Sequence, residues 1–156
     1  MTPAIKLLQK QKIAHQVLEY EHDPNASSFG LEAAQKLNLP ADQVFKTLLA
    51  TDGKAYFVAI LPVDCRLSLK KLAMVVGAKK LQMADAEDAE RITGYLVGGI
   101  SPLAQKKRLK TVIQTQARHL ECMYVSGGKR GCDVGIHPND LAKLLNAMFA
   151  DVIESA

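Results

Sequence analysis

The chain has 156 residues and a mass of 17.0 kDa, which is enough for one hydrophobic core and argues against two. Apolar residues make up 48% of it and charged residues 23%, the balance of an ordinary soluble globular domain. The net charge of +4 is too small to indicate a nucleic-acid-binding protein by itself. A chain with no Trp, four Tyr and four Phe also does not offer a base-stacking platform.

Five elements are expected in the first half of the chain, from capping residues and from the spacing of apolar residues. Thr2 and Pro3 form a helix-start pair, and Asp52-Gly53 is a strong hairpin signal. In chain order, we expect a helix from Pro3 to about Gln11, a strand from Ile13 to Tyr20, a helix that begins after Ser27 or Ser28 and reaches Leu37, a strand from Val44 to Ala50, and a strand from Ala55 to Leu61.

The second half adds three helices and four strands. Ser68 and Gly77 bracket one helix, and the acids Asp85 and Asp88 begin another that ends near Arg91. Strands are expected at 81–83, 111–114, 122–125 and 132–136. Pro138 opens a last helix, whose apolar stripe consists of Leu141, Leu144, Leu145, Met148 and Val152.

These elements mix helices and strands without a strict strand–helix–strand alternation, and no repeat or linker interrupts them. We therefore expect residues 1–156 to form a single α+β domain. Its sheet is expected to be mixed, mainly antiparallel, and curved or barrel-like, with helices around it.

Lys46 is the single charge in the apolar segment from Val44 to Ala50. Lysine is almost never fully buried unless it is paired, so this position needs an explanation. One interpretation is an edge-strand lysine that reaches water or prevents aggregation. The other is a cationic group held in a pocket for an anionic or ester-bearing ligand.

Two glycine-containing turns could also contribute to a site. Gly98-Gly99-Ile100-Ser101-Pro102 allows a ligand to approach bare backbone N–H groups, but it does not fit the GxGxxG or P-loop patterns. Ser126-Gly127-Gly128-Lys129-Arg130-Gly131 has no GxSxG context, which argues against a serine nucleophile. Each segment is also compatible with a plain turn.

The basic run from Lys106 to Lys110 has two interpretations as well. Such runs are usually solvated faces, but next to the glycine turns this one would meet a polyanion such as an RNA end. Together, the two glycine turns, the strand lysine and the basic residues fit a pocket better than four unrelated features.

No metal, other cofactor or membrane contact is expected. Cys65, Cys122 and Cys132 form no CxxC pair, and the four histidines are scattered. A disulfide between the last two cysteines would require them to lie on paired strands. The N-terminus lacks the apolar core of a secretory signal, and no run nears the roughly 20 apolar residues of a membrane span, so a cytoplasmic location is expected.

Three segments carry a family resemblance: Phe45-Lys46-Thr47-Leu48, residues 93–102 (TGYLVGGISP) and residues 124–131 (YVSGGKRG). They resemble the YbaK-type aminoacyl-tRNA deacylases, which are free-standing relatives of the editing domain of bacterial prolyl-tRNA synthetase. The likeness extends from the first helix to the last. Within the superfamily the chain looks most similar to members that remove cysteine from proline tRNA.

The resemblance implies roles for individual residues. Lys46 matches the family's essential lysine, with the implied role of binding the terminal phosphate or ribose and fixing the ester rather than attacking it. Gly98, Gly99, Ile100 and Ser101 match the segment whose backbone N–H groups hold the carbonyl or the ribose. The other positions that match the pocket are Ser126 with the adjoining Gly127, Asp133, Tyr20 and Phe29.

The resemblance also implies a reaction that needs no metal. In cysteine-specific members the substrate's own thiol is thought to attack its ester and release a cyclic thiolactone, which suits a site that positions the ester and stabilises an oxyanion. The implied partners are a mischarged tRNA and prolyl-tRNA synthetase. Two alternatives stay open: hydrolysis of Ala-tRNA(Pro) by water, and a non-catalytic module that binds tRNA or the synthetase.

Overall fold

The computed structural model describes residues 1–155, which form five α-helices and eight strands. The α-helices are α1 (Pro3–Lys10), α2 (Phe29–Lys36), α3 (Leu69–Val76), α4 (Ala86–Thr93) and α5 (Pro138–Leu145). The strands are β1 (His15–Glu19), β2 (Phe45–Thr51), β3 (Tyr56–Pro62), β4 (Gln82–Met83), β5 (Lys110–Gln114), β6 (Met123–Lys129), β7 (Cys132–Ile136) and β8 (Met148–Ala150). Two 3-10 helices, η1 (Ala41–Gln43) and η2 (Thr115–His119), precede β2 and β6.

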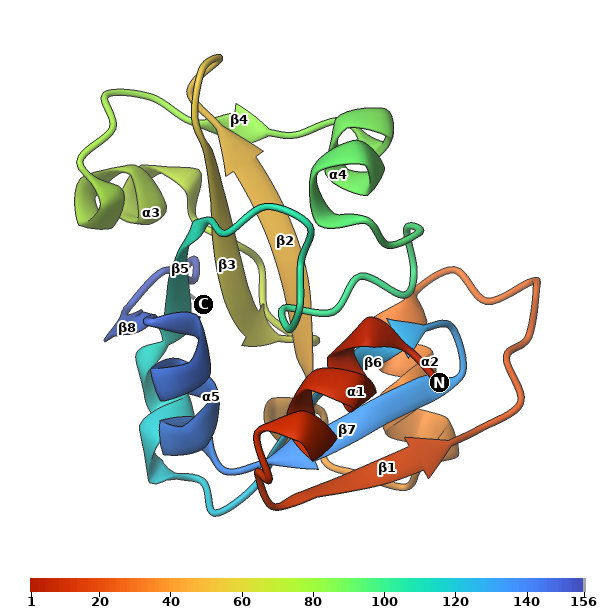
Figure 1. Cartoon of the computed structure of the whole chain (residues 1–156). Helices are drawn as coiled ribbons and strands as arrows, with labels where there is room; N and C mark the ends of the chain where they lie inside the picture. The colour runs from red at the N-terminus through yellow and green to blue at the C-terminus, as the bar shows by residue number, and fades with distance from the viewer. Residues whose placement is uncertain (156) are drawn as a thin grey trace.

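The strands form two open sheets (Figure 1). The larger has the order β4-β2-β3-β5-β8, antiparallel from β4 to β3 and parallel from β3 to β8. The smaller, β1-β7-β6, is antiparallel throughout and meets the larger at a bridge between Val44 and Tyr124. This confirms the α+β class and the mixed sheet, whose strands divide into two sheets and do not close into a barrel.

Capping residues fix the helix ends at the positions that the sequence indicates. The side chains of Ser28, Ser68 and Asp85 each accept a hydrogen bond from the backbone N–H three residues later. Gly77 and Gly94 end their helices in the left-handed conformation, with φ of +80° and +83°. Local chemistry therefore fixes where α2, α3 and α4 begin and where α3 and α4 end along the chain.

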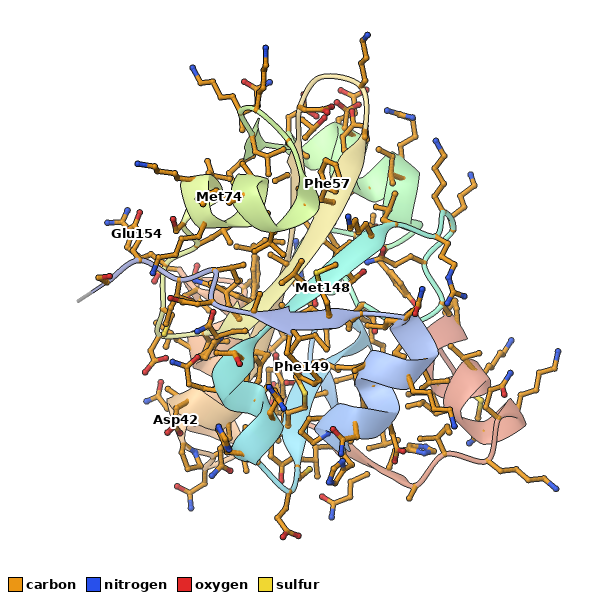
Figure 2. The ribbon with its side chains drawn as sticks, turned by 90° about the vertical axis from the view of Figure 1, so that its left-hand side faces the viewer. Asp42, Phe57, Met74, Met148, Phe149 and Glu154 are labelled. Carbon is orange, nitrogen blue, oxygen red and sulfur yellow. The ribbon has the colours of Figure 1, made fainter. Side chains whose placement is uncertain are left out.

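The predicted last helix is too long. Helix α5 ends at Leu145, because Asn146 adopts a left-handed conformation with φ of +50°. Met148 then lies in β8, which pairs in parallel with β5, and Figure 2 shows Met148 and Phe149 on this strand beyond the helix. Val152 is buried beside β5, where its N–H donates to Gln114 Oε1 at 2.7 Å. The apolar residues beyond Leu145 have a spacing that fits a helix, but in the structure they lie in β8 and in the segment after it.

The first predicted strand also begins later than expected. Lys12 has φ of +56°, and the N–H of Ile13 donates to Leu8 O at 3.0 Å, so this segment closes α1 instead of starting a strand. Strand β1 begins at His15.

Strands β2 and β3 separate two apolar clusters. On one side Phe45, Leu49 and Ile60 pack in the main core with residues of β6, β7 and α1. On the other side Ala50 and Leu61 pack under α3. Strand β2 therefore has apolar neighbours on both faces, and only Lys46, Thr47 and Leu48 of this strand are partly exposed. None of the helices described in residues 1–155 is long and apolar enough to cross a bilayer.

Candidate functional site

A cavity of about 450 Å³ lies along the edge of β2 that faces away from β3. Strand β4 pairs with β2 only at Ala50 and Thr51, so this edge is open over Phe45 to Leu48. Seven predicted site residues line the cavity: Tyr20, Phe29, Lys46, Gly98, Ile100, Ser126 and Asp133. The structure thus brings together residues from α2, β2, β6, β7 and the segment after α4.

The other three predicted residues lie behind the cavity wall. Ser101 is fully buried, and its hydroxyl accepts a hydrogen bond from the Leu103 N–H at 3.2 Å. Gly127 accepts a hydrogen bond from the Thr2 hydroxyl. A Cβ on Gly99 would lie 2.7 Å from Lys129 Cα, so the absence of a side chain there lets the two glycine turns stack. These residues support the wall from behind.

Lys46 lies half-buried in the cavity. Burial lowers the pKa of its ammonium, which Cys65 and Asp64 partly oppose. Among residues 1–155, no carboxylate lies within ion-pair distance of it. Lys46 lies on the strand with the open edge and lines the cavity, so its position is compatible with both interpretations. A half-buried cation without a carboxylate partner is suited to an anionic group of a ligand.

Thr47 is a site residue that the sequence analysis did not identify. It lines the cavity, and its Oγ1 is the one buried side-chain polar atom without a hydrogen-bond partner among residues 1–155. A buried hydroxyl is almost always paired, so an unpaired one that lines a cavity is free to bond a ligand. The only signal in the sequence was its position directly after Lys46.

The backbone of Thr47 is directed toward the cavity as well. In an antiparallel pair, N–H and C=O groups point toward the partner strand at alternate residues. The bond from the Val63 N–H to Val44 O places residues 44, 46 and 48 in the set that faces β3. The bond from the Ala84 N–H to Leu49 O places residues 45, 47 and 49 in the set that faces the open edge.

The segment after α4 lines the cavity with Val97, Gly98 and Ile100 and can offer backbone N–H groups to a ligand. The N–H of Gly99 donates to Leu96 O at 2.9 Å, whereas no hydrogen bond of the Gly98 or Ile100 N–H is formed within residues 1–155. Gly98 has φ of +92°. The Tyr95 hydroxyl donates to Leu103 O at 2.6 Å and holds this segment in place. Its unpaired N–H groups are therefore held on a fixed backbone beside Lys46.

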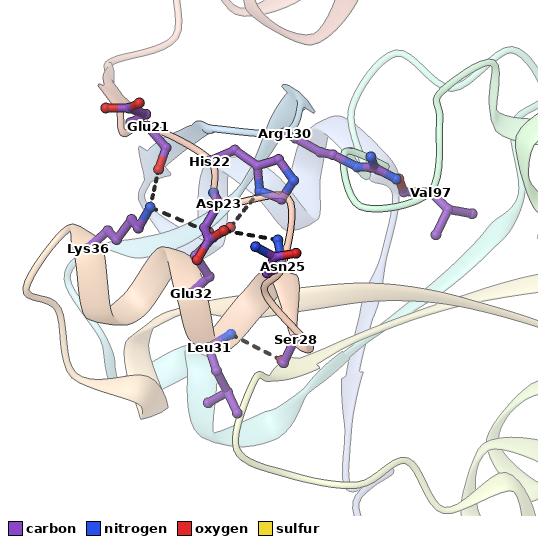
Figure 3. Close-up of polar contacts among 10 residues, drawn as sticks. All are labelled: Glu21, His22, Asp23, Asn25, Ser28, Leu31, Glu32, Lys36, Val97 and Arg130. Atoms are coloured by element: carbon purple, nitrogen blue, oxygen red, sulfur yellow. Dashed lines mark hydrogen bonds and ion pairs between the residues drawn. The ribbon is translucent and has the colours of Figure 1, made fainter.

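Arg130 connects three parts of the wall. Its Nε and Nη2 donate to Val97 O at 3.1 and 2.8 Å, and its guanidinium carbon lies 4.8 Å from the centre of the Phe29 ring. Figure 3 shows the side chain reaching toward Val97. A Cβ on Gly98 would lie 2.5 Å from Arg130 Nε, so glycine is required for this contact. The sequence analysis treated Arg130 only as part of a basic turn.

Glu32 holds the loop between Tyr20 and Phe29. Its carboxylate lies 2.7 Å from His22 Nδ1 and accepts a hydrogen bond from the Asp23 N–H at 2.7 Å (Figure 3). Burial alone would raise the pKa of Glu32, but the Asp23 N–H, His22 and Lys36 together lower it. His22 lies in the loop between β1 and α2, and this contact fixes its ring against α2.

Asp133 is buried beside Ser126, its cross-strand neighbour, and is only 6% exposed. Burial raises its pKa from 3.8 to about 7, so neutral and ionised forms coexist near neutral pH. Burial, together with the charge of Asp133, raises the pKa of Tyr20 to about 12. Asp133 can therefore hold or accept a proton at the wall of the cavity.

The three cysteines are free thiols. Within residues 1–155, no group of three His, Cys, Asp or Glu side chains is arranged to hold a metal ion.

A family model described as an aminoacyl-tRNA editing domain matches residues 23–144. The chain belongs to this family. It is 33% identical over 153 residues to EbsC of Enterococcus faecalis, which is provisionally named a Cys-tRNA(Pro)/Cys-tRNA(Cys) deacylase. That alignment covers 97% of this chain and 92% of the relative. The predicted resemblance is confirmed.

Two other relatives extend the comparison. The chain is 22% identical over 151 residues to the prolyl-tRNA editing protein ProX of Acetoanaerobium sticklandii, covering 95% of this chain and 85% of that protein. It is 27% identical over 119 residues to a proline–tRNA ligase of Thermosipho africanus, where it corresponds to 21% of the ligase. The expected class of enzyme, an aminoacyl-tRNA deacylase, agrees with the relatives' names.

Solved structures share the fold. A protein described as a candidate trans-editing enzyme for prolyl-tRNA synthetase superposes with a TM-score of 0.85 at 23% identity, covering 99% of both chains. The hypothetical protein APE2540 superposes with a TM-score of 0.87 at 23% identity, over 97% of this chain and 99% of that one.

Proposed function

We propose that the protein is a trans-editing aminoacyl-tRNA deacylase that cleaves the ester of cysteine mischarged onto proline tRNA, and also accepts Cys-tRNA(Cys). The observation that carries the proposal is the half-buried Lys46 ammonium, which lines the cavity without a carboxylate partner among residues 1–155. The name of the relative at 33% identity supports cysteine as the amino acid and proline tRNA as the carrier.

Each wall of the cavity suits one part of an aminoacyl-adenosine end. Lys46 suits the terminal phosphate or the ribose, because these groups place negative charge or acceptor oxygens beside the ester. The unpaired N–H groups of Gly98 and Ile100 suit the oxygen that becomes negative when the carbonyl is attacked. Thr47 suits the amino acid's α-amino group, since its C=O and hydroxyl can both accept a hydrogen bond.

The proposed reaction uses the substrate's own thiol. The sulfur, as a thiolate, attacks the carbonyl carbon to form a C–S bond, and the C–O bond to the ribose breaks. The proton lost by the thiol ends on the ribose oxygen, so the products are a cysteine thiolactone and uncharged tRNA. Asp133 can relay this proton, because a pKa of about 7 lets it take up and release a proton near neutral pH. No enzyme nucleophile is required.

A water-dependent reaction is the alternative, and Asp133 is the observation that favours it. In its ionised form this carboxylate could accept a proton from water that attacks Ala-tRNA(Pro). Seryl-tRNA(Pro) separates the two reactions, because its hydroxyl replaces the thiol while the size of the side chain is nearly kept. Thiol-dependent cleavage should lose most of its rate on seryl-tRNA, whereas water-dependent cleavage should continue.

The experiment is to incubate the protein with cysteinyl-, seryl-, alanyl- and prolyl-tRNA(Pro) and to follow loss of the ester. We expect rapid loss from cysteinyl-tRNA alone and no turnover by Lys46→Ala. Equal loss from all four substrates would contradict the cysteine specificity. Salt-sensitive tRNA binding without any turnover would instead support a non-catalytic binding module.

The proposed partner is prolyl-tRNA synthetase, because part of the ligase relative is similar to this chain. The proposed location is the cytoplasm. Gel filtration of the protein with the synthetase and tRNA tests the partnership. Absence of a complex at micromolar concentrations would argue against it.

A further inference from the structure

A second cavity, of about 660 Å³, lies between α1, α5 and the segment from Pro102 to Thr111. In Figure 1 these three parts surround one face of the molecule. The floor of the cavity is apolar and includes Leu7, Ile13 and Leu144. We call it the basic groove, because cationic side chains stand around this floor.

The charges of the basic groove are one-sided. Lys107, Arg108 and Lys143 line it and are exposed, and the one acid in the lining is Asp140. Lys10 is exposed at the rim, because it follows Leu7 by three positions on α1 and so lies on a neighbouring strip of the helix surface. Within residues 1–155, none of these four cations takes part in an ion pair. The charged residues that line the groove therefore sum to +2, and to +3 with Lys10 at the rim.

The basic groove and the candidate site share one continuous segment. Val97, Gly98 and Ile100 line the site, and Pro102, Gln105 and Lys107 line the groove. The side-chain amide of Gln105 donates to Ser101 O at 3.0 Å, which ties the two parts together. Ser101 and Leu103, fully buried between them, anchor the segment. One short segment therefore contributes lining residues to both the site and the groove.

We infer that the basic groove binds the phosphate backbone of the tRNA acceptor end while its terminal adenosine lies in the candidate site. This rests on the proposed function. A nucleic acid is favoured because it repeats negative charge at intervals that several unpaired cations can match. The groove also explains how a domain with few aromatic residues binds RNA, since phosphate contacts need no base stacking.

The test compares two substrates: cysteinyl-tRNA(Pro), and cysteine esterified to adenosine alone, which has no internucleotide phosphate that could contact the groove. The variant is Lys107→Gln/Arg108→Gln, in which both side chains are exposed and neither lines the site. The matched control is Lys79→Gln/Lys80→Gln, two exposed neighbouring lysines outside both cavities. Thermal unfolding of both variants verifies that they are folded.

We expect the groove variant to raise the KM for the full tRNA by on the order of tenfold, with kcat and cleavage of the short substrate unchanged. The slope of log KM against log salt concentration should become shallower by about 1.5 to 2, the value for two lost phosphate contacts. The control should match the wild type. Equal effects on both substrates, or none on either, would overturn the inference.

Two further outcomes separate the inference from what it rests on. If the wild type cleaves neither substrate, the proposed function fails, and binding of uncharged tRNA by the wild type and the groove variant then decides the inference alone. If the groove variant binds tRNA normally but no longer co-elutes with prolyl-tRNA synthetase, the groove is a protein-docking surface and the inference is wrong.

Discussion

The pH dependence of stability gives a direct test of the buried Asp133. Its pKa is raised from 3.8 to about 7 in the folded protein, so the fold favours the neutral acid. Below pH 3.8 the acid is protonated in both states. Between pH 3.8 and 7 only the folded state holds the proton, so the free energy of unfolding falls as pH rises, by about 1.4 kcal/mol for each pH unit. Above pH 7 the loss levels off at about 4 kcal/mol.

Asp133→Asn removes this titration while keeping nearly the same shape. Between pH 5 and pH 8.5 the wild type should lose about 3 kcal/mol more unfolding free energy than the variant. Any pH-independent effect of the amide cancels in this comparison. Urea unfolding at a series of pH values measures it, and the urea dependence of the two proteins should stay equal. Parallel pH profiles for wild type and variant would refute the assignment of a raised pKa to Asp133.

Three further substitutions test the cavity walls. Arg130→Lys loses the paired bonds to Val97 O and the contact with the Phe29 ring, so kcat/KM should fall about fivefold, while Lys129→Met, an exposed neighbour, should leave it unchanged. Thr47→Val removes an unpaired buried hydroxyl, so thermal unfolding should show a gain of about 1 kcal/mol while turnover falls; unchanged turnover would mean that the hydroxyl binds no substrate. Gly98→Ala would place a Cβ 2.5 Å from Arg130 Nε at a φ of +92°, so stability should fall by about 1–3 kcal/mol, and a neutral result would contradict the close contact.

The features predicted from the sequence are those that local chemistry determines. Ser68, Asp85, Gly77 and Gly94 act within one helical turn of their own positions, so their roles could be predicted without knowing the fold. The isolated charge of Lys46 in an apolar strand also indicated an unusual position, although the sequence left an edge lysine and a pocket lysine as alternatives.

The features that were missed depend on distant parts of the chain. The parallel pairing of β3 with β5 and of β5 with β8 joins segments that no turn connects, so the division into two sheets had no local signal. Met148 and Val152 have a helical spacing by coincidence. The helix ends before them, because Asn146 adopts a left-handed conformation. The role of Thr47 rests on a hydroxyl without a hydrogen-bond partner, and that of Arg130 on its contacts with Val97 and Phe29. A sequence pattern contains neither observation.

The shortness of β4 has a consequence for how the exposed edge of β2 could pair with other chains. An open strand edge can pair with a further strand, and here the open stretch from Phe45 to Leu48 spans roughly 10 Å. A charge at this edge discourages another chain from adding there, so Lys46 would keep the mouth of the cavity free of a further strand. Its replacement by alanine would then remove turnover and also promote self-association through β2. A longer β4 would close the same stretch and abolish the cavity while leaving every proposed functional side chain in place.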